Sequence, residues 1–221
     1  MNVEKNISQI TASLGANCRL VAVSKTHGVE KIMAAYQAGQ RIFGENRVQE
    51  MVEKQPLLPS DIEWHMIGHL QRNKVKHIAG FVALIHSVDS VRLLQEINRQ
   101  GERASRVIPC LIQVHIAEEE TKFGFAADEV PEIVTSEATA ALHNVEIRGL
   151  MGMATLTDDE DRIRREFRGL RDLFDRVKAM PTAPNVRFTE LSMGMSNDYQ
   201  IAVEEGSTLV RIGSAIFGER N

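Results

Sequence analysis

Short apolar runs alternate with amphipathic segments along the whole chain. Eight runs rich in β-branched and other apolar residues predict strands, at 18–25, 41–45, 62–67, 84–88, 107–116, 145–151, 187–191 and 207–212. Apolar residues at helical spacing predict helices between them, over 29–38, 48–54, 73–79, 91–99, 127–142, 161–180 and 197–205. A further helix is predicted ahead of the first strand, at 3–14. This alternation favours an α/β protein with a parallel sheet and crossover connections.

Eight such units fit either a closed (β/α)8 barrel or an open doubly wound sheet, and the periodicity alone leaves both possible. No GxGxxG follows the first strand and no GxxxxGK[ST] occurs, so the usual phosphate loops of open α/β sheets are missing. We therefore favour the barrel, preceded by the extra N-terminal helix. No linker or low-complexity stretch interrupts the chain, so we expect one domain over residues 1–221.

Composition and charge narrow the class of protein. Of 221 residues, 43% are hydrophobic and 25% charged, which is the composition of one well-packed domain. The net charge of −4 gives no electrostatic reason to expect nucleic-acid binding. Neither a signal-peptide core nor an apolar stretch of about 20 residues occurs, so we expect a cytoplasmic protein without a membrane span. Cys18 and Cys110 lie in apolar runs and are expected to be buried free thiols.

Lys25 closes the first predicted strand. Alternation places Val21, Val23 and Lys25 on one face, so the amine projects from the carboxyl end of the strand. A lysine at that position is costly to bury unless its charge is neutralised or used. Considered alone, the stretch favours a lysine that merely reaches solvent. An amine that forms an imine with an aldehyde is the alternative, and it needs support from the rest of the chain.

Two stretches near the end of the sequence combine small and hydroxyl residues. In SMGMSND, at 192–198, Ser196 or Asn197 is suited to cap the next helix and leave backbone N–H groups available to an anion. In RIGSAIFG, at 211–218, Gly213 allows close approach to the backbone and Ser214 adds a hydroxyl donor. Either stretch alone also fits an ordinary turn. Their occurrence together, after the last two strands of a barrel, favours a phosphate site.

Arg211 lies inside the last predicted strand, where a charge is unexpected unless it meets a partner. A guanidinium beside an aromatic nitrogen donates a hydrogen bond and keeps that nitrogen unprotonated. A lysine, a phosphate pocket and an arginine are together the groups needed to hold pyridoxal 5'-phosphate.

The chain resembles the pyridoxal phosphate homeostasis protein family, also called the YggS or proline synthetase co-transcribed homologue family. The resemblance rests on AVSKTHG, FGENRVQE, WHMIGHLQRNK, HSVDS, RGLMGMAT and LSMGMSNDYQIAVEEGSTLVRIGSAIFG, and it spans residues 18 to 219. It implies a single (β/α)8 barrel similar to the N-terminal domain of alanine racemase, with pyridoxal phosphate held as an imine on Lys25. It also implies cofactor contacts at Asn46, Ser192, Met193, Ser196, Arg211, Gly213 and Ser214. The family often has tyrosine where Arg47 stands, so we expect no contact by such a ring here.

The same features favour a carrier over a catalyst. A pyridine paired with arginine is a weak electron sink. Racemisation needs two acid–base groups on opposite faces of the α-carbon, and the resemblance implies that racemases take one of them from a second domain. This sequence ends at Asn221, and its two tyrosines, Tyr36 and Tyr199, lie in predicted helices. We therefore expect a protein that binds and hands over the cofactor in vitamin B6 and amino-acid balance, without robust catalysis and without catalytic residues.

Other functions stay open at this point. The alternatives are a weak amino-acid racemase, a Schiff-base lyase or an aldolase on the same barrel, and an interaction module that uses the segment ENRVQE at 45–50. We expect a monomer whose partners, besides pyridoxal phosphate, are apo-enzymes that receive the cofactor. His65 and His69 are four residues apart but span a strand end and a loop, so no metal site is expected.

Overall fold

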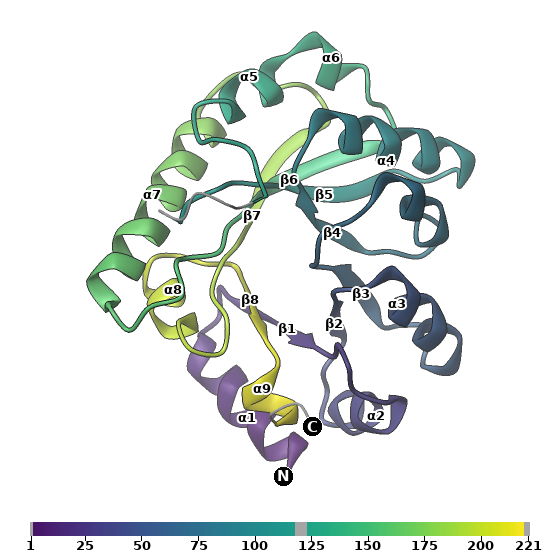
Figure 1. Cartoon of the computed structure of the whole chain (residues 1–221), viewed down its shortest axis with the longest axis vertical. Coiled ribbons are helices and arrows are strands. Elements are labelled where there is room, and N and C mark those ends of the chain that lie inside the picture. Colours follow the sequence, from purple (N-terminus) through teal and green to yellow (C-terminus); the bar gives the residue numbers. More distant parts are fainter. Residues whose placement is uncertain (1, 118–122, 219–221) are drawn as a thin grey trace.

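The structure is a computed structural model and describes residues 2–117 and 123–218. Eight parallel strands form a closed barrel in sequence order, with helices around it (Figure 1). They are β1 (Arg19–Val23), β2 (Ile42–Glu45), β3 (Glu63–Met66), β4 (Leu84–Val88), β5 (Ile108–Gln113), β6 (Val145–Met151), β7 (Val186–Ser192) and β8 (Leu209–Ile212). The predicted barrel is confirmed, because β1 pairs with β8 and leaves no open edge.

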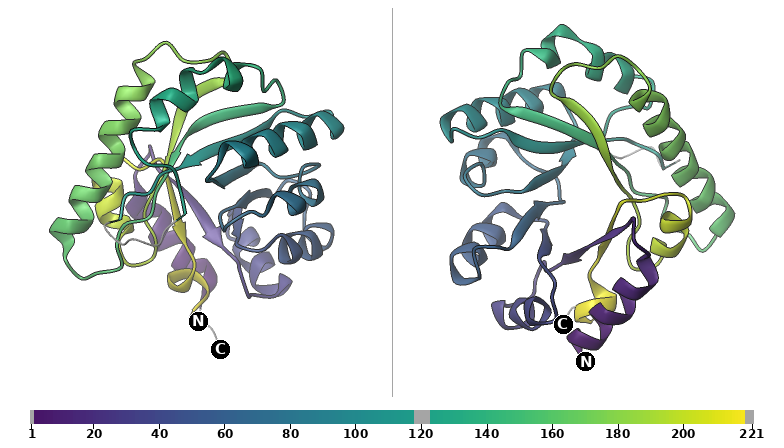
Figure 2. Two further views of the ribbon diagram at one scale, coloured as in Figure 1. Left: turned by 45° about the horizontal axis from the view of Figure 1, so that its top comes forward. Right: turned by 180° about the vertical axis from the view of Figure 1, so that it is seen from behind.

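The helices largely follow the predicted segments. They are α1 (Val3–Leu14), α2 (Val29–Gln37), α3 (Val48–Lys54), α4 (Val91–Arg103), α5 (Val130–Thr135), α6 (Glu137–Ala140), α7 (Glu160–Lys178), α8 (Tyr199–Glu204) and α9 (Ser214–Phe217), with 3₁₀ turns η1 (Gln55–Leu57) and η2 (Arg72–His77). No helix within the described residues is both long and apolar enough to span a membrane. The first and last helices pack together, so the two ends of the described chain lie close to each other (Figure 2).

Three helix predictions need correction. The segment 73–79 forms a 3₁₀ helix instead of an α-helix. The segment 127–142 is broken because Ser136 is extended and its hydroxyl accepts a hydrogen bond from the Thr139 N–H, which starts a new helix. The helix after β7 begins at Tyr199 with Asp198 as its cap, so neither Ser196 nor Asn197 caps it.

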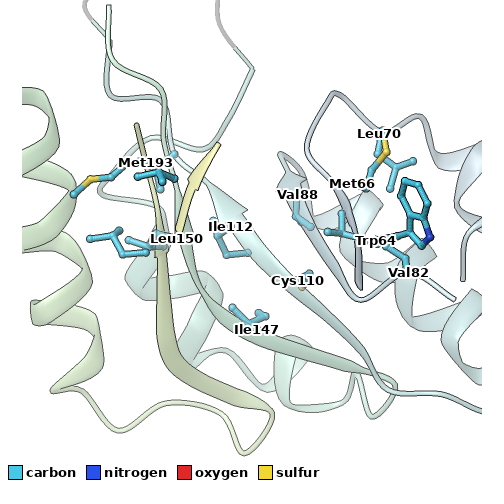
Figure 3. Packing of buried hydrophobic residues seen from close by; sticks show 14 of the residues in the cluster. Trp64, Met66, Leu70, Val82, Val88, Cys110, Ile112, Ile147, Leu150 and Met193 are labelled. Atoms are coloured by element: carbon cyan, nitrogen blue, oxygen red, sulfur yellow. The ribbon is translucent and has the colours of Figure 1, made fainter. Parts of the chain in front are cut away.

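Two apolar clusters fill the protein. The larger lies between the barrel and the helices, and Figure 3 shows part of it, including Trp64, Cys110 and Leu150. The smaller cluster draws on six strands and no helix, and therefore lies inside the barrel; it consists of Val21, Ile42, Leu84, Leu111, Met151 and Leu209. Both cysteines are buried and free, as predicted.

Register shifts in β6 and β7 change which residues face inward. In β7, Val186 and Phe188 belong to the outer cluster, and so does Leu191, although strict alternation would place Leu191 on the opposite side. Gly149 lies at the shift in β6 with φ +145°, where an added Cβ would collide with the Glu190 carbonyl oxygen. The shifts direct Met151 and Ser192 toward the barrel axis.

Candidate functional site

A cavity of about 910 Å³ opens at the carboxyl ends of the strands. Val21 belongs to the cluster inside the barrel, and Val23 and Lys25 line the cavity on the same face of β1. β1 ends at Val23, two residues before its predicted end, so Lys25 continues the inward-facing row from the turn after the strand. Other walls of the cavity come from the segments that follow β2, β6, β7 and β8.

Four polar side chains form a hydrogen-bonded chain across the inside of the barrel. Arg211 Nη1 donates to Ser192 Oγ at 2.6 Å, Ser192 Oγ lies 2.9 Å from His86 Nδ1, and His86 Nε2 lies 2.9 Å from His65 Nδ1. All four residues are buried, and they come from β8, β7, β4 and β3. A second Arg211 nitrogen, Nη2, donates to the Gly152 carbonyl oxygen at 3.0 Å. The polar chain thus ties Arg211 to three other strands and to the end of β6.

Arg211 sets the direction of every proton in this chain. A guanidinium donates only, and no other acceptor among the described residues lies within reach of Ser192 Oγ, so the hydroxyl donates to His86 Nδ1. His86 then carries its proton on Nε2 and donates to His65 Nδ1. The geometry therefore fixes one tautomer for each imidazole.

Burial keeps both histidines neutral and leaves the arginine charged. Burial lowers the pKa of His65 to about 3, with smaller contributions from Arg19 and Arg148. Burial, His65 and Arg211 hold the pKa of His86 well below its ordinary value. Burial also lowers the pKa of Arg211 to about 10, while Asp198 opposes the shift, so the guanidinium is still protonated at neutral pH. The floor of the cavity thus carries one fixed positive charge.

Hydroxyl groups from two neighbouring loops meet at the rim of the cavity. Ser214 Oγ, after β8, donates to Ser196 Oγ, after β7, at 3.0 Å, and both residues line the cavity with Gly213. Asp198 shapes the first loop, since its Oδ1 accepts the Met195 N–H at 2.5 Å. Burial raises the pKa of Asp198, which the Met195 N–H and Arg211 partly counteract. The two hydroxyls form a donor pair suited to an anion.

The predicted contact residues fall into two groups. Lys25, Asn46, Ser196, Arg211, Gly213 and Ser214 all line the one cavity. Ser192 lies below it and reaches the cavity only through Arg211. The side chain of Met193 is buried in the outer cluster, and its N–H donates to the Leu209 carbonyl oxygen. For Met193, the structure provides packing instead of a polar contact.

Sequence reasoning missed the two histidines as members of the site. His65 and His86 lie within adjacent predicted strands. Each has the parity of an inward position, since Ile67 and Leu84, two residues away, belong to the apolar packing inside the barrel. That parity is the signal that could have identified them. Among the described residues, no group of three His, Cys, Asp or Glu side chains is arranged to bind a metal ion.

Comparisons with known proteins identify one family and relatives that match nearly the whole chain. The model of the alanine racemase N-terminal domain family matches residues 1–221. A pyridoxal phosphate homeostasis protein from Aquifex aeolicus is 43% identical over 211 residues, which are 95% of this chain and 90% of that protein. One from Haemophilus influenzae is 36% identical over 234 residues, covering 100% of this chain and 97% of that protein.

Solved structures similar to this one include a protein called PipY and alanine racemases. PipY of Synechococcus elongatus, solved without pyridoxal phosphate, is 36% identical with a TM-score of 0.91, over 98% of this chain and 100% of that one. PipY with pyridoxal phosphate bound is 35% identical with a TM-score of 0.85, over the same shares of the two chains. Alanine racemase of Bartonella henselae, 18% identical with a TM-score of 0.74, shares the fold over 99% of this chain and 58% of its own.

Proposed function

This chain belongs to the alanine racemase N-terminal domain family and, within it, to the pyridoxal phosphate homeostasis proteins, and we propose that it binds pyridoxal phosphate through Lys25. The observation that carries the proposal is the convergence of Lys25, Arg211 and the Ser196–Ser214 pair on one cavity. These residues come from β8 and from the segments that follow β7, β8 and β1, three consecutive strands of the barrel.

The residues present fit this cofactor. The cavity is within the usual size range of small-molecule sites, roughly 300–1,000 Å³, and offers an amine, a fixed cation and a hydroxyl pair. Gly213 lines the cavity and packs closely against β1, because a Cβ there would approach the Val23 carbonyl oxygen to 3.1 Å. The donors match a ligand with an aldehyde, a ring nitrogen and a phosphate.

Each residue has a separate task in this proposal. Lys25 would hold the cofactor covalently, its Nζ replacing the aldehyde oxygen, which would be released as water. Ser196 and Ser214 would hold the phosphate through their hydroxyl groups, and the Arg211 guanidinium would donate to the ring nitrogen and keep it unprotonated. When bound, the cofactor supplies an electrophilic carbon and an electron-withdrawing ring.

The surroundings of the cavity support a carrier more than a racemase. Tyr36 donates to Asp61 at the surface, and Tyr199 Oη lies 3.4 Å from Ser13 Oγ. Among the described residues that line the cavity there is no tyrosine to act as a second acid–base group. We propose that the protein stores pyridoxal phosphate and passes it to apo-enzymes, with at most weak turnover.

Spectroscopy and mapping test this function. The purified protein is titrated with pyridoxal phosphate, reduced with borohydride, digested and mapped, and we expect visible absorbance and a reduced adduct on Lys25. An adduct on another lysine would contradict the site. The loaded protein is then incubated with D- and L-alanine and D- and L-serine, and racemisation at ordinary enzymatic rates would overturn the carrier role.

A further inference from the structure

Lys54, the last residue of α3, is buried behind Lys25 and is surrounded by three acceptors. Its Nζ donates to Glu45 Oε1 at 2.8 Å, to the Ser24 carbonyl oxygen at 3.0 Å and to Glu50 Oε2 at 3.1 Å. Three acceptors match the three N–H donors of an ammonium group. Lys54 is therefore committed to this cluster.

The cluster lies outside the barrel, between the strands and α3. Ser24 follows Val23, which lines the cavity, so alternation turns the Ser24 side chain the other way, and its Oγ donates to Glu45 Oε1 at 2.6 Å. Lys25 turns back toward the cavity. The Lys54 cluster thus holds the outer side of the segment whose inner side presents the amine.

Lys25 is the second residue of a tight turn. The His27 N–H donates to the Ser24 carbonyl oxygen at 3.1 Å, and Thr26, the third residue, has φ +66°. A positive φ at the third position is the type II pattern, which glycine or asparagine normally occupies. A positive φ is unfavourable for a β-branched residue such as threonine, so another interaction must hold the turn in this conformation.

Glu50 provides that interaction. Its Oε2 accepts the Thr26 N–H at 2.8 Å, and the same oxygen accepts Lys54 Nζ. The Thr26 N–H belongs to the peptide between Lys25 and Thr26, and types I and II differ by a flip of this central peptide. The bond from Glu50 therefore selects the type II orientation.

We propose that Lys54 is a positioning residue for Lys25: through Glu50 and Ser24 it holds the Lys25–Thr26 peptide in the orientation that aims the Lys25 amine into the cavity. This inference rests on the proposed function only for the role of Lys25. Lys54 contacts both neighbours of Lys25, Ser24 directly and Thr26 through Glu50. Without it, the turn relaxes to a negative φ at Thr26 and the amine changes direction.

The electrostatics of the cluster agree with this role. Burial acts to raise the pKa of Glu50, but the Thr26 N–H and Lys54 outweigh it, so the pKa lies below its ordinary value. Burial raises the pKa of Glu45, against the opposing effect of Lys54 and Ser24. Among the described residues no donor reaches the buried Glu45 Oε2, so Lys54 is the cation on which this carboxyl group depends.

The first test needs no cofactor. In the free protein, Lys54→Met is compared with wild type by hydrogen exchange at the Thr26 amide and by crystallography. We expect at least tenfold faster exchange at Thr26 and a negative φ in the crystal structure. A Thr26 amide that stays protected with φ near +66° would overturn the inference.

The second test measures binding of pyridoxal phosphate. We expect Lys54→Met to weaken binding at Lys25 about tenfold, the usual consequence of losing a bond that holds a strained turn. Thr26→Gly in the Lys54→Met background is expected to restore most of that affinity, because glycine adopts a positive φ without strain. A loss of affinity that Thr26→Gly leaves unchanged would show that Lys54 acts only on general stability, against the inference.

Two further variants keep the outcome clear. Arg106→Met removes a side chain that bonds the Ala79 and Val82 carbonyl oxygens, away from the cavity lining, and is expected to leave the affinity unchanged. If Lys54→Met does not fold, Glu50→Ala tests the same bond with the Lys54–Glu45 pair intact, and wild-type affinity in that variant would overturn the inference. If wild type itself forms no adduct on Lys25, the proposed function fails instead, while the exchange test still decides the turn.

Discussion

The two sides of the cavity mouth, one at β1 and β2 and the other at β7 and β8, differ in the polar groups that form them. Behind Lys25, at β1 and β2, a buried ammonium and two carboxylates fix the backbone. At β7 and β8 the rim presents the Ser196–Ser214 hydroxyl pair and Gly213, with Asp198 and Arg211 buried behind them. The difference follows from what each side must bind. One amine nitrogen must reach one carbon from one direction, whereas a phosphate has several equivalent oxygens and accepts donors from many directions.

Replacing the amine should produce the largest difference between the two sides. In Lys25→Ala, we expect no visible absorbance and no borohydride-trapped adduct, because no other lysine within 2–117 and 123–218 lines the cavity. Binding through the hydroxyl side should remain, weakened and reversible. Lys178→Ala, which removes an amine that lies over the Phe174 ring away from the cavity lining, is the matched control and should behave as wild type. A trapped adduct in Lys25→Ala would show that the lysine side is not needed for covalent binding.

Replacing Arg211 tests whether the side of the cavity mouth at β7 and β8 depends on a buried charge for its stability. Arg211→Met leaves Ser192 Oγ and the Gly152 carbonyl oxygen without their donor, and we expect the free energy of unfolding to fall by about 2–4 kcal/mol. Urea denaturation measures this. Arg168→Met, which removes a surface ion pair with Glu205, should cost at most about 1 kcal/mol. Equal losses of unfolding free energy in the two variants would mean that the polar chain inside the barrel stabilises the protein no more than a surface ion pair does.

The buried histidines predict a pH dependence below neutrality. Their pKa values are lower in the folded than in the unfolded protein, so the unfolded state binds more protons and stability falls as pH drops below about 6.5. Each contributes a slope of up to about 1.4 kcal/mol per pH unit. Urea denaturation between about pH 6.5 and 5 measures the slope. His65→Asn should reduce it by about one histidine's share, and an unchanged slope would contradict the burial argument.

The smallest effect should come from the hydroxyl pair. Ser196→Ala with Ser214→Ala removes two donors that act on an anion with several oxygens, so backbone groups and water replace part of the loss. We expect pyridoxal phosphate to bind about tenfold more weakly, with the Lys25 adduct still formed. Titration at fixed salt concentration measures this. Loss of the adduct itself would show that the two sides of the mouth are not separable.

Regular alternation made the lysine side predictable from sequence in part. Val21 and Val23 face inward as predicted, but β1 ends at Val23 instead of running to residue 25, and Lys25 keeps the inward direction from within the turn that follows. The Lys54 cluster could not be predicted, since it depends on how α3 packs against the turn after β1. His65 and His86 lie on the paired strands β3 and β4, but the contact of His86 with Ser192 exists only because the closed barrel brings β7 across the same axis.

The side of the mouth at β7 and β8 was predicted only in part. The small and hydroxyl residues identified the two loops, and both line the cavity. The helix start was misplaced because Asp198, not Ser196 or Asn197, precedes α8. Strict alternation from Phe188 would also turn Ser192 outward, and only the register shift returns it to the axis.

Because of the register shifts in β6 and β7, the number of residues in these strands decides which side chains face the barrel interior, as strongly as residue type does. Deleting one residue between Phe188 and Ser192 would exchange inside for outside in the end of β7, so that an apolar side chain faced Arg211 and the serine faced the helices. No single substitution in that strand does as much. Relatives of this protein should therefore tolerate many replacements there, but very few insertions or deletions.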